Sequence, residues 1–587
     1  MKRHLAFFAL FVFFVFFGLP QADAHTLFDS GRSAYRIVVA DDASTTERYA
    51  AEELQYWLKQ VGGANLSIVG ERKGTTGKRI LIGYGNEVKR LVKTARPKAD
   101  DQGFVYGNVG GDVYIYGGKE IGTLYGVYTF LENEMGCRWY TKDFSYIPRK
   151  KKYEFDKLYD KEEPAFLSRD LYYYDAFDAK WTLRNKTHGR KNILKTNHGT
   201  IQVPSEAFWS VHTFNKLCKP DVYFKKHPEY FSLRGGKRTT DQLCLSNKEV
   251  LRICISRIKE VMTNYPYFLI YSVTQNDNQN PCQCKDCKKL VKKYGGESGA
   301  MLWFVNQVAA AVERDFPGKY IGTFAYQYTR KAPQGIQPRQ NVVIRLCSIE
   351  CCFTHTIGGC RQNAAFLEDM KAWSRISPHL YVWDYVTTFQ QYLLPFPNIP
   401  VLKRNLQTFR DNKAIGVMEE GSYDVPGGDF AELKAYLLAK LMWNPDADAE
   451  AIVEEFIKAY YGKAAPRMKE YLALVNGLVG KETHLTCQTS IYHGRSTYTD
   501  AFINRALAIL SKAEKDAESE TIRDRVRLQK MVPAYMQCRV MTKAGGKSGS
   551  YELIKKMAAK HKIDRFAEGG SLKDPKAFYD MMDKYGK

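Results

Sequence analysis

The sequence predicts an α/β fold class, with a TIM-like (β/α)8 barrel at residues 160–445 between an N-terminal α+β domain at 25–155 and a C-terminal helical domain at 446–587. Three observations predict this architecture. Apolar and aromatic runs typical of buried strands recur eight times between residues 166 and 443, with helix-like segments between several of them. Strand and helix signals alternate before this region, and the pattern after Asn444 is almost wholly helical. Eight repeats in about 280 residues agree with the ~250 residues of a typical barrel.

The first 24 residues predict a secretory signal peptide. Lys2 and Arg3 precede an apolar stretch at 5–19, and a small-x-small site at 22–24 follows. We expect cleavage after Ala24 and export to the periplasm or medium. The apolar stretch is too short for a comfortable membrane span, and no later stretch approaches ~20 apolar residues, so we expect no membrane span.

The N-terminal domain begins with the strand-like run YRIVVA at 35–40. Ser44 and Glu47 have the spacing of a capping box, which predicts a helix through Leu58. The runs RILIG and DVYIYG predict further strands, and apolar residues at helical spacing predict a last helix that Gly136 ends. The acidic residues fall on polar helix faces, so we expect no catalytic role for this domain.

The last of these helices carries a resemblance. Residues 122–140, GTLYGVYTFLENEMGCRWY, are similar to the last helix of the small domain that precedes the catalytic barrel in bacterial α-glucuronidases and β-hexosaminidases. The resemblance implies a domain that supports a glycosidase barrel. It does not identify the sugar.

The barrel prediction depends on eight runs. They are LSRDLYYYDAF (167–177), FWSVHTF (208–214), QLCLS (242–246), FLIYSVTQND (268–277), YIGTFAYQY (320–328), NVVIRLCSIE (341–350), LYVWDYV (380–386) and IGVMEEG (415–421). Parallel strands buried on both faces read as continuous apolar runs of this kind. In such a barrel the carboxyl ends of all strands face one mouth, where the chemistry takes place.

Acidic side chains stand at several of these strand ends. We expect Asp277 and Glu350 to be the essential catalytic pair, with Glu419 as the third acid and Glu420 as its alternative. Several acids in one cleft repel one another and lose hydration, so chemistry is the best reason for them. Glycoside hydrolysis needs one carboxylic acid that protonates the leaving oxygen and a second carboxylate that acts as nucleophile, base or stabiliser.

Aromatic and polar residues crowd the same strand ends. Flat rings with a polar tip suit the C–H faces of sugars, whose hydroxyls take hydrogen bonds. A metal cluster is the rival use of the acids, but few histidines, only His212 and His355, fall near strand ends. The residues that we expect to bind substrate are Asn276, Tyr326, Trp383, Asp384 and Glu420.

The loop after the fourth strand contains Cys282, Cys284 and Cys287. Three thiolates this close suit zinc if a fourth ligand comes from elsewhere, and Cys244, Cys351, Cys352 or His355 are candidates. The alternative is a pair of disulfides, which an exported protein allows and which we favour. Either way we expect a structural role, with no cofactor other than a structural zinc.

The formal net charge is +23. The basic residues are scattered among acidic ones, so we interpret them as a solvated surface and expect no nucleic-acid partner. The oligomeric state stays open.

The barrel closely resembles the exported bacterial proteins grouped as domain of unknown function 4838, part of which is classified as glycoside hydrolase family 163. The matching motifs are HPEYFSLRGGKR, QLCLSN, SVTQNDN, FAYQYTRKAP, RLCSIECCFTH, WDYVTTFQQYLLPFPN and EEGSYD, which run across nearly the whole barrel. The resemblance implies an endo-β-N-acetylglucosaminidase acting on complex N-glycans. Attack by a second carboxylate and attack by the acetamide of the sugar both fit. The alternatives are an α-glucuronidase, in which Arg345 binds the uronate, and a non-catalytic glycan-binding protein.

Overall fold

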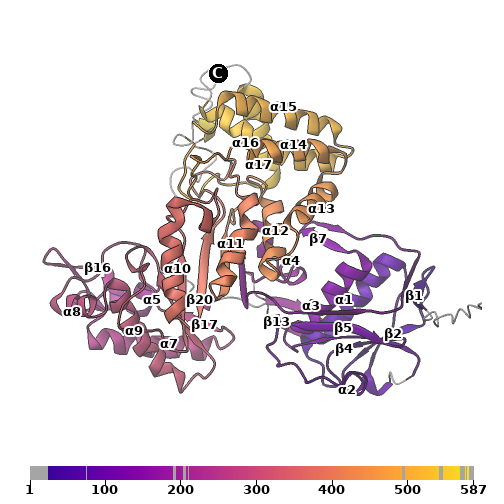
Figure 1. Cartoon of the computed structure of the whole chain (residues 1–587), viewed down its shortest axis with the longest axis horizontal. Helices are drawn as coiled ribbons and strands as arrows, with labels where there is room; N and C mark the ends of the chain where they lie inside the picture. The colour runs from indigo at the N-terminus through magenta and orange to yellow at the C-terminus, as the bar shows by residue number, and fades with distance from the viewer. Residues whose placement is uncertain are drawn as a thin grey trace, which may run out of the picture. The chain divides into compact units, whose positions relative to one another are not determined.

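The computed structural model describes residues 24–73, 76–189, 193–202, 207–208, 211–491, 496–540, 547–568, 576 and 578–580 (Figure 1). The predicted signal peptide, Met1 to Ala24, lies outside the described residues except for its last residue. Within the described ranges no helix is both long and apolar enough to cross a membrane. The chain divides into two compact units, Met1–Met135 with Pro148–Lys161, and Gly136–Ile147 with Glu162–Lys587.

The first unit is a mixed sheet with helices. Its strands are β1 (His25–Asp29), β2 (Tyr35–Val39), β3 (Ile68–Gly70), β4 (Lys78–Ile82), β5 (Phe104–Val109), β6 (Asp112–Gly117), β9 (Lys152–Phe155) and β10 (Tyr159–Glu162). Its helices are α1 (Thr45–Gly62), α2 (Asn86–Leu91) and α3 (Gly122–Phe130). Six strands form one sheet in the order β10-β5-β6-β4-β2-β3, in which β5 is antiparallel to β6.

Both predicted helices of this unit form, although α1 continues to Gly62, four residues beyond the predicted end at Leu58. Ser44 and Glu47 form the reciprocal capping box that opens α1. Helix α3 continues as one π-helical turn, Leu131–Met135, and Gly136 then ends it with a left-handed φ of 80°.

The second unit contains the parallel sheet. Its strands are β7 (Arg138–Thr141), β8 (Phe144–Tyr146), β11 (Ser168–Tyr172), β12 (Ile193–Thr196), β13 (Gly199–Gln202), β14 (Ala207–Phe208), β15 (Phe231–Arg234), β16 (Lys237–Leu243), β17 (Ile270–Ser272), β18 (Tyr320–Ala325), β19 (Val342–Cys347), β20 (Leu380–Tyr385) and β21 (Ala414–Glu420). Seven of them form one parallel sheet in the order β11-β21-β20-β19-β18-β17-β14.

This order is that of a barrel that stays open. The first strand pairs with the last, as in a TIM barrel, but among the described residues no pairing joins β11 to β14. The closed eight-stranded barrel is therefore not confirmed, and a curled half-barrel of parallel strands stands in its place.

The prediction that the run QLCLS forms a barrel strand is wrong. Its first residues end β16, which pairs antiparallel with β15 outside the parallel sheet. Gly235 and Gly236 lie between these strands with φ of 52° and 78°, a backbone that favours glycine. The two glycines close a tight hairpin, which folds the run back on residues 231–234.

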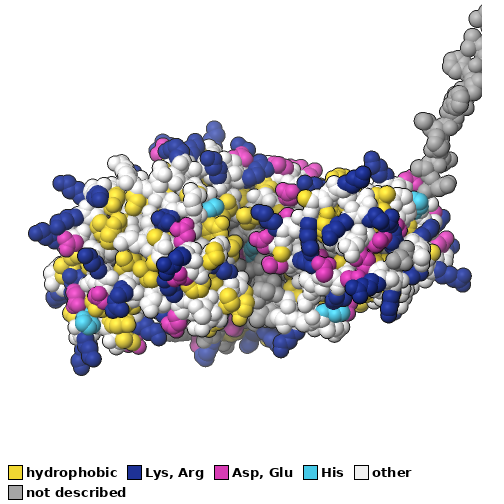
Figure 2. Space-filling model, turned by 90° about the horizontal axis from the view of Figure 1, so that it is seen from below, with side chains coloured by type: hydrophobic (Ala, Val, Ile, Leu, Met, Phe, Trp, Pro, Cys, Tyr) yellow, Lys and Arg dark blue, Asp and Glu magenta, His cyan; other side chains and the backbone are white. Residues whose placement is uncertain are grey.

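Helices connect and follow the strands of the second unit. They are α4 (Ala179–Arg184), α5 (Phe214–Leu217), α6 (Pro220–Tyr223), α7 (Lys248–Asn264), α8 (Lys285–Lys293), α9 (Glu297–Glu313), α10 (Ala364–Ile376), α11 (Ile399–Asp411), α12 (Ala431–Trp443), α13 (Ala449–Tyr461), α14 (Ala465–Asn476), α15 (Asp500–Asp516), α16 (Glu520–Val540) and α17 (Lys547–His561). The last five form the C-terminal helical region and share one large apolar core with the parallel sheet. The face drawn in Figure 2 shows Lys and Arg side chains spread among Asp and Glu, as expected for a solvated surface.

Candidate active site

A cleft opens at the carboxyl ends of the parallel strands. It encloses about 1120 Å³ of empty space, part of which is open to solvent. Strands β11, β18, β19, β20 and β21 each contribute a residue at or beside their last position. The described lining residues are Tyr172, Val211, His212, Asp277, Phe324, Tyr326, Cys347, Ile349, Trp383, Tyr385, Phe389, Glu420, Tyr423, Gln488 and Glu568.

Glu420 is the buried acid of this cleft. Its side chain lines the cleft although the residue is only 8% exposed, and its Oε2 accepts a hydrogen bond of 2.8 Å from the indole Nε1 of Trp383. Burial, followed by the negative charge of Glu568, raises the pKa of Glu420 to about 8. The carboxyl group is therefore protonated at neutral pH and can donate a proton.

The alternation of side chains along a strand decides which of the two adjacent glutamates meets the cleft. In the β20–β21 register Tyr385 pairs with Glu420, and Asp384 pairs with Glu419. Successive side chains point to opposite faces, so Glu420 shares the face of Tyr385 and Glu419 shares that of Asp384.

Glu419 and Asp384 accordingly lie on the other face of the sheet. Each is 1% exposed, and neither lines the cleft. Asp384 Oδ1 accepts a hydrogen bond of 2.5 Å from Ser348 Oγ, and burial raises the pKa of Asp384 to about 6. Burial also raises the pKa of Glu419 well above its usual value, with the charge of Asp384 adding to the effect. Burial therefore makes both residues harder to ionise than an exposed carboxyl group.

Asp277 is the exposed carboxylate of the cleft. It lies five residues beyond the end of β17, and its Oδ1 accepts a hydrogen bond of 3.0 Å from the hydroxyl of Tyr326. The Tyr326 oxygen in turn accepts one of 2.8 Å from Gln327 Nε2. Gln327 has a left-handed φ of 51°, a backbone strain that the surroundings maintain. Asp277 and Tyr326 thus form a positioned acceptor and donor pair.

Asn276 precedes Asp277 in the chain and supports the pair of Asp277 and Tyr326 through its hydrogen bonds. It is 9% exposed, its Nδ2 donates to the carbonyl of Asp241 at 2.7 Å, and its backbone N–H donates to Gln242 Oε1 at 3.0 Å. Asn276 does not line the cleft. Its contacts fix the segment that carries Asp277.

Glu350 lies outside the described lining of the cleft. It is an exposed residue whose Oε2 forms an ion pair of 3.0 Å with Arg330, and Arg330 also pairs with Asp369 at 2.8 Å. The described lining of the cleft therefore contains Asp277, Tyr326, Trp383 and Glu420, whereas Glu350, Glu419, Asp384 and Asn276 are not part of it.

Gln488, Glu568 and His212 are among the lining residues that the sequence did not single out as site residues. Gln488 and Glu568 come from the C-terminal helical region, for which the sequence indicates only a structural role. Glu568 accepts a hydrogen bond of 2.6 Å from the hydroxyl of Tyr423. His212 was noted only as a histidine near a strand end; it has a left-handed φ of 50°, and its Nδ1 lies 2.9 Å from the carbonyl of Gln275.

The charge of the cleft is negative. The acidic side chains of Asp277 and Glu568 line it beside the protonated Glu420, and no Lys or Arg is among the lining residues that the structure describes. Arg345 is 3% exposed, and its guanidinium carbon lies 5.7 Å from the ring centre of Trp383 and 4.9 Å from that of Tyr381. Arg345 therefore packs against aromatic rings and is not among the described lining residues.

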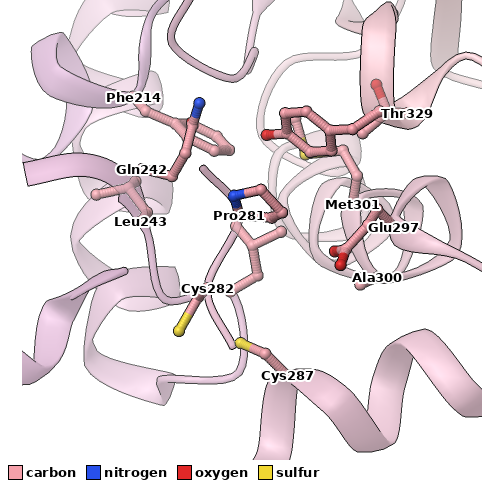
Figure 3. A pocket seen from close by; sticks show the side chains of 12 residues that line it. Phe214, Gln242, Leu243, Pro281, Cys282, Cys287, Glu297, Ala300, Met301 and Thr329 are labelled. Carbon is pink, nitrogen blue, oxygen red and sulfur yellow. The ribbon is translucent and has the colours of Figure 1, made fainter. Parts of the chain in front are cut away.

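The cysteine loop contains no disulfide in the structure. None of the thirteen cysteines is in a disulfide, which corrects the disulfide expectation for Cys282, Cys284 and Cys287. Cys244 Sγ lies 3.7 Å from Cys284 Sγ and 3.8 Å from Cys287 Sγ, against ~2.05 Å in a disulfide. Figure 3 shows Cys282 and Cys287 at the wall of a small, mostly apolar cavity that shares no residue with the cleft of Asp277 and Glu420.

Comparisons with known proteins agree with this architecture. The profile of the family described as "Domain of unknown function (DUF4838)" matches residues 139–473, and that described as "Glycosyl hydrolase family 67 N-terminus" matches residues 21–130. These matches confirm both resemblances expected from the motifs. No curated protein matches the sequence.

Three solved structures are similar to this chain. A family GH115 4-O-methyl-α-glucuronidase with specificity for decorated arabinogalactans is similar with a TM-score of 0.57 and 11% identity, over 91% of this chain and 77% of that one. A GH138 enzyme targeting pectin rhamnogalacturonan II has a TM-score of 0.40 and 11% identity, over 90% and 74%. A GH84 structure has a TM-score of 0.43 and 12% identity, over 92% of this chain and 95% of that one. The first likeness shows a shared fold.

Proposed function

The chain belongs to the family described as domain of unknown function 4838, and from this premise we propose that it is a glycoside hydrolase that cuts a neutral oligosaccharide in the strand-end cleft. The observation that carries the proposal is Glu420, a buried carboxyl group with a pKa of about 8 that lines a cleft walled by aromatic rings. Glycosidases need such an acid, because the leaving oxygen departs as an alcohol only if it receives a proton.

Glu420 is the general acid in this proposal. The hydrogen bond from Trp383 fixes its carboxyl group, and the negative charge of Glu568 helps to keep the proton on it. The proton passes from Glu420 to the glycosidic oxygen as the bond to the anomeric carbon breaks. The Glu420 carboxylate that remains can then take a proton from the attacking water.

Asp277 and Tyr326 hold the substrate for this step. An N-acetyl sugar carries an acetamide whose oxygen can attack the anomeric carbon of the same sugar. Asp277 accepts the acetamide N–H, and the Tyr326 hydroxyl, now 3.0 Å from Asp277, turns to the acetamide oxygen as a donor. The attack forms a cyclic oxazolinium ion, which the negative charge of Asp277 stabilises until water opens it. This role differs from the catalytic pairing of Asp277 with Glu350, because Glu350 is bound to Arg330 outside the cleft.

The finer proposal is an endo-β-N-acetylglucosaminidase that acts on complex N-glycans after export of the protein. The resemblance to family 163 supports it, and the cleft supports the neutral sugar. A uronate would meet Asp277, Glu420 and Glu568 with no Lys or Arg among the described lining residues to pair with it. Aromatic rings such as Trp383 and Tyr385 suit the apolar faces of pyranoses.

A panel of complex N-glycans and glucuronoxylan fragments, with products read by mass, tests this proposal. We expect N-glycans to be cut between the two core N-acetylglucosamines and the xylan fragments to stay intact. The Glu420→Gln variant should lose at least ~100-fold in turnover, and Glu350→Gln, its exposed counterpart, should lose less than tenfold. Release of glucuronic acid would favour the α-glucuronidase, and binding without products would favour a glycan-binding protein.

A further inference from the structure

The second unit carries two clusters of soft ligands that lie outside the cleft. In the first, the sulfur atoms of Cys244, Cys282, Cys284 and Cys287 all lie within 4.8 Å of one another. In the second, ligand atoms of Cys352, His355, Cys360 and His484 meet the same limit. We propose that each cluster binds one structural zinc ion, so that the protein holds two zinc ions per chain.

The distances in the first cluster are those of a tetrahedral tetrathiolate site. Zn–S bonds of ~2.3 Å at tetrahedral angles put the sulfur atoms ~3.8 Å apart. The Cys244–Cys284 and Cys244–Cys287 separations are 3.7 and 3.8 Å. Cys282, Cys244 and Cys287 are buried and Cys284 is partly exposed, so at least three thiolates here would have no water to stabilise them and would need a cation in their centre.

The second cluster has the distances of a Cys2His2 site. Zn–S of ~2.3 Å and Zn–N of ~2.0–2.1 Å put sulfur and nitrogen ~3.5–3.6 Å apart. Cys352 Sγ lies 3.3 Å from His355 Nδ1 and 3.4 Å from His484 Nδ1, and Cys360 Sγ lies 3.6 Å from His484 Nδ1. Separate thiol hydrogen bonds account for single pairs, but a shared metal accounts for all four atoms meeting.

A hydrogen bond on the outer side of His355 supports this assignment. His355 Nε2 lies 3.2 Å from the carbonyl oxygen of Gly480, to which only a protonated nitrogen can donate. With the proton on Nε2, the lone pair of Nδ1 faces Cys352 and is free to bind a metal. A carbonyl behind a metal-binding histidine is the usual second layer of such sites.

The ligand types select zinc. Tetrahedral sets of four thiolates, or of two thiolates and two imidazoles, bind zinc or iron–sulfur centres, and the mixed set with two histidines suits a single zinc ion. All four coordination positions come from the protein, so neither ion has an open position for substrate. The role is structural, as in closed zinc sites generally.

The first site braces the segment of Asp277. Cys244 follows Gln242 by two residues, and Gln242 Nε2 donates to the carbonyl oxygen of Asn276 at 2.8 Å. Cys282 follows Asp277 by five residues. A metal that joins Cys244 to Cys282 therefore connects the segment that carries Asp277 to the segment of Gln242 that supports it.

The second site joins the loop after β19 to the C-terminal helical region. Cys352, His355 and Cys360 lie in that loop, and His484 lies between α14 and α15. Thr354 Oγ1 also donates to the carbonyl oxygen of Thr483 at 2.6 Å across the same junction. Four residues beyond His484, Gln488 reaches the cleft, so this metal fixes a wall of the cleft from a distance.

Metal analysis of the full-length protein tests the proposal. Protein expressed with its leader and purified without chelators should carry two zinc ions per chain by elemental analysis and by native mass spectrometry. Cys284→Ser and His484→Asn change the partly exposed ligands of the two clusters, and each should lower the zinc content to one. Cys254→Ala, a buried cysteine of α7 outside both clusters, is the matched control and should keep two.

Cobalt distinguishes the sites without relying on the stability of the variants. After exchange of zinc for Co²⁺, the Cys284→Ser variant should retain only the second site and show the spectrum of tetrahedral cobalt bound by two thiolates. The His484→Asn variant should retain only the first site and show the spectrum of tetrahedral cobalt bound by four thiolates. Sulfur-to-cobalt charge transfer should therefore be about twice as strong in the His484→Asn variant. Wild-type protein without metal, with thirteen free thiols or with disulfides seen by mass, would overturn the proposal. If the wild-type chain carries one zinc ion and only one of the two variants loses it, the site that the other variant changes does not bind zinc.

Discussion

Replacing Glu420 by Gln should change how the stability of the protein depends on pH. Burial raises the pKa of Glu420 from 4.5 to about 8 in the folded protein. A group whose pKa is raised on folding contributes stability that is fully present when the pH is below the pKa of the unfolded state. This contribution is lost as the pH rises through the pKa of the folded state. Each pKa unit is worth ~1.4 kcal/mol, so the contribution lost between pH 4.5 and 8 is at most about 5 kcal/mol.

The glutamine variant cannot ionise and escapes this loss. The free energy of unfolding of Glu420→Gln relative to wild type should therefore rise by several kcal/mol from pH 4.5 to pH 9, measured by urea unfolding at each pH. Asp384 also has a raised pKa, about 6, but both proteins contain it and its own titration cancels in the difference.

Glu552→Gln is the control for this measurement, because Glu552 is exposed on α17 and its replacement should leave the difference from wild type flat across pH. A flat difference for Glu420→Gln as well would refute the reasoning. It would mean that Glu420 titrates like an ordinary glutamate and is ionised at neutral pH.

The remaining predictions concern binding and folding. Asp277→Asn should lower turnover on an N-acetyl substrate by at least ~100-fold, and Tyr326→Phe should lower it less, because it keeps Asp277 and removes only one donor; equal activity of both variants and wild type would exclude the acetamide role. Trp383→Ala should weaken glycan binding by calorimetry more than any single Arg substitution, and raising the salt concentration should barely change kcat/KM, since the substrate is neutral; a steep salt dependence would favour a uronate. Lys434→Met should destabilise the fold by ~3–5 kcal/mol in urea unfolding, because Lys434 Nζ lies 2.9 Å from Asp429 in the interior and its loss leaves that charge unpaired; a change below ~1 kcal/mol would contradict this.

The sequence predicts the strand ends of the site well, because local patterns define them. The run from Phe268 to Asp277 shows a buried strand followed at once by polar residues, and the structure has β17 there with Asp277 in the cleft. Aromatic residues next to acids at the ends of β18, β20 and β21 place Tyr326, Trp383 and Glu420 in the same cleft.

The sequence does not show which of two adjacent acidic residues lines the cleft. Glu419 and Glu420 have the same chemistry, and only the register of β21 against β20 shows which of them faces the cleft. Glu350 follows the end of β19 much as Asp277 follows the end of β17, but Glu350 forms an ion pair with Arg330 and is not part of the described lining of the cleft. Such outcomes depend on pairing across the sheet, which a single sequence does not contain.

Contacts between distant segments are the other part that the sequence leaves out. Glu568 and Gln488 reach the cleft from the helical region, and His484 meets Cys352 across the same junction. The open edge between β11 and β14 belongs to this class as well, because closure of a barrel depends on its geometry as a whole and not on any single run.

The role of Glu420 as the proton donor is best tested by the pH dependence of kcat/KM for release of a complex N-glycan, because this quantity reports the ionisation of the free enzyme. We predict that the glycan is released, and that kcat/KM falls about tenfold for each pH unit above the Glu420 pKa of about 8. No release of glycan between pH 5 and 9, or a basic limb that falls near the pKa of ~4.3 of an ordinary glutamate, would contradict it.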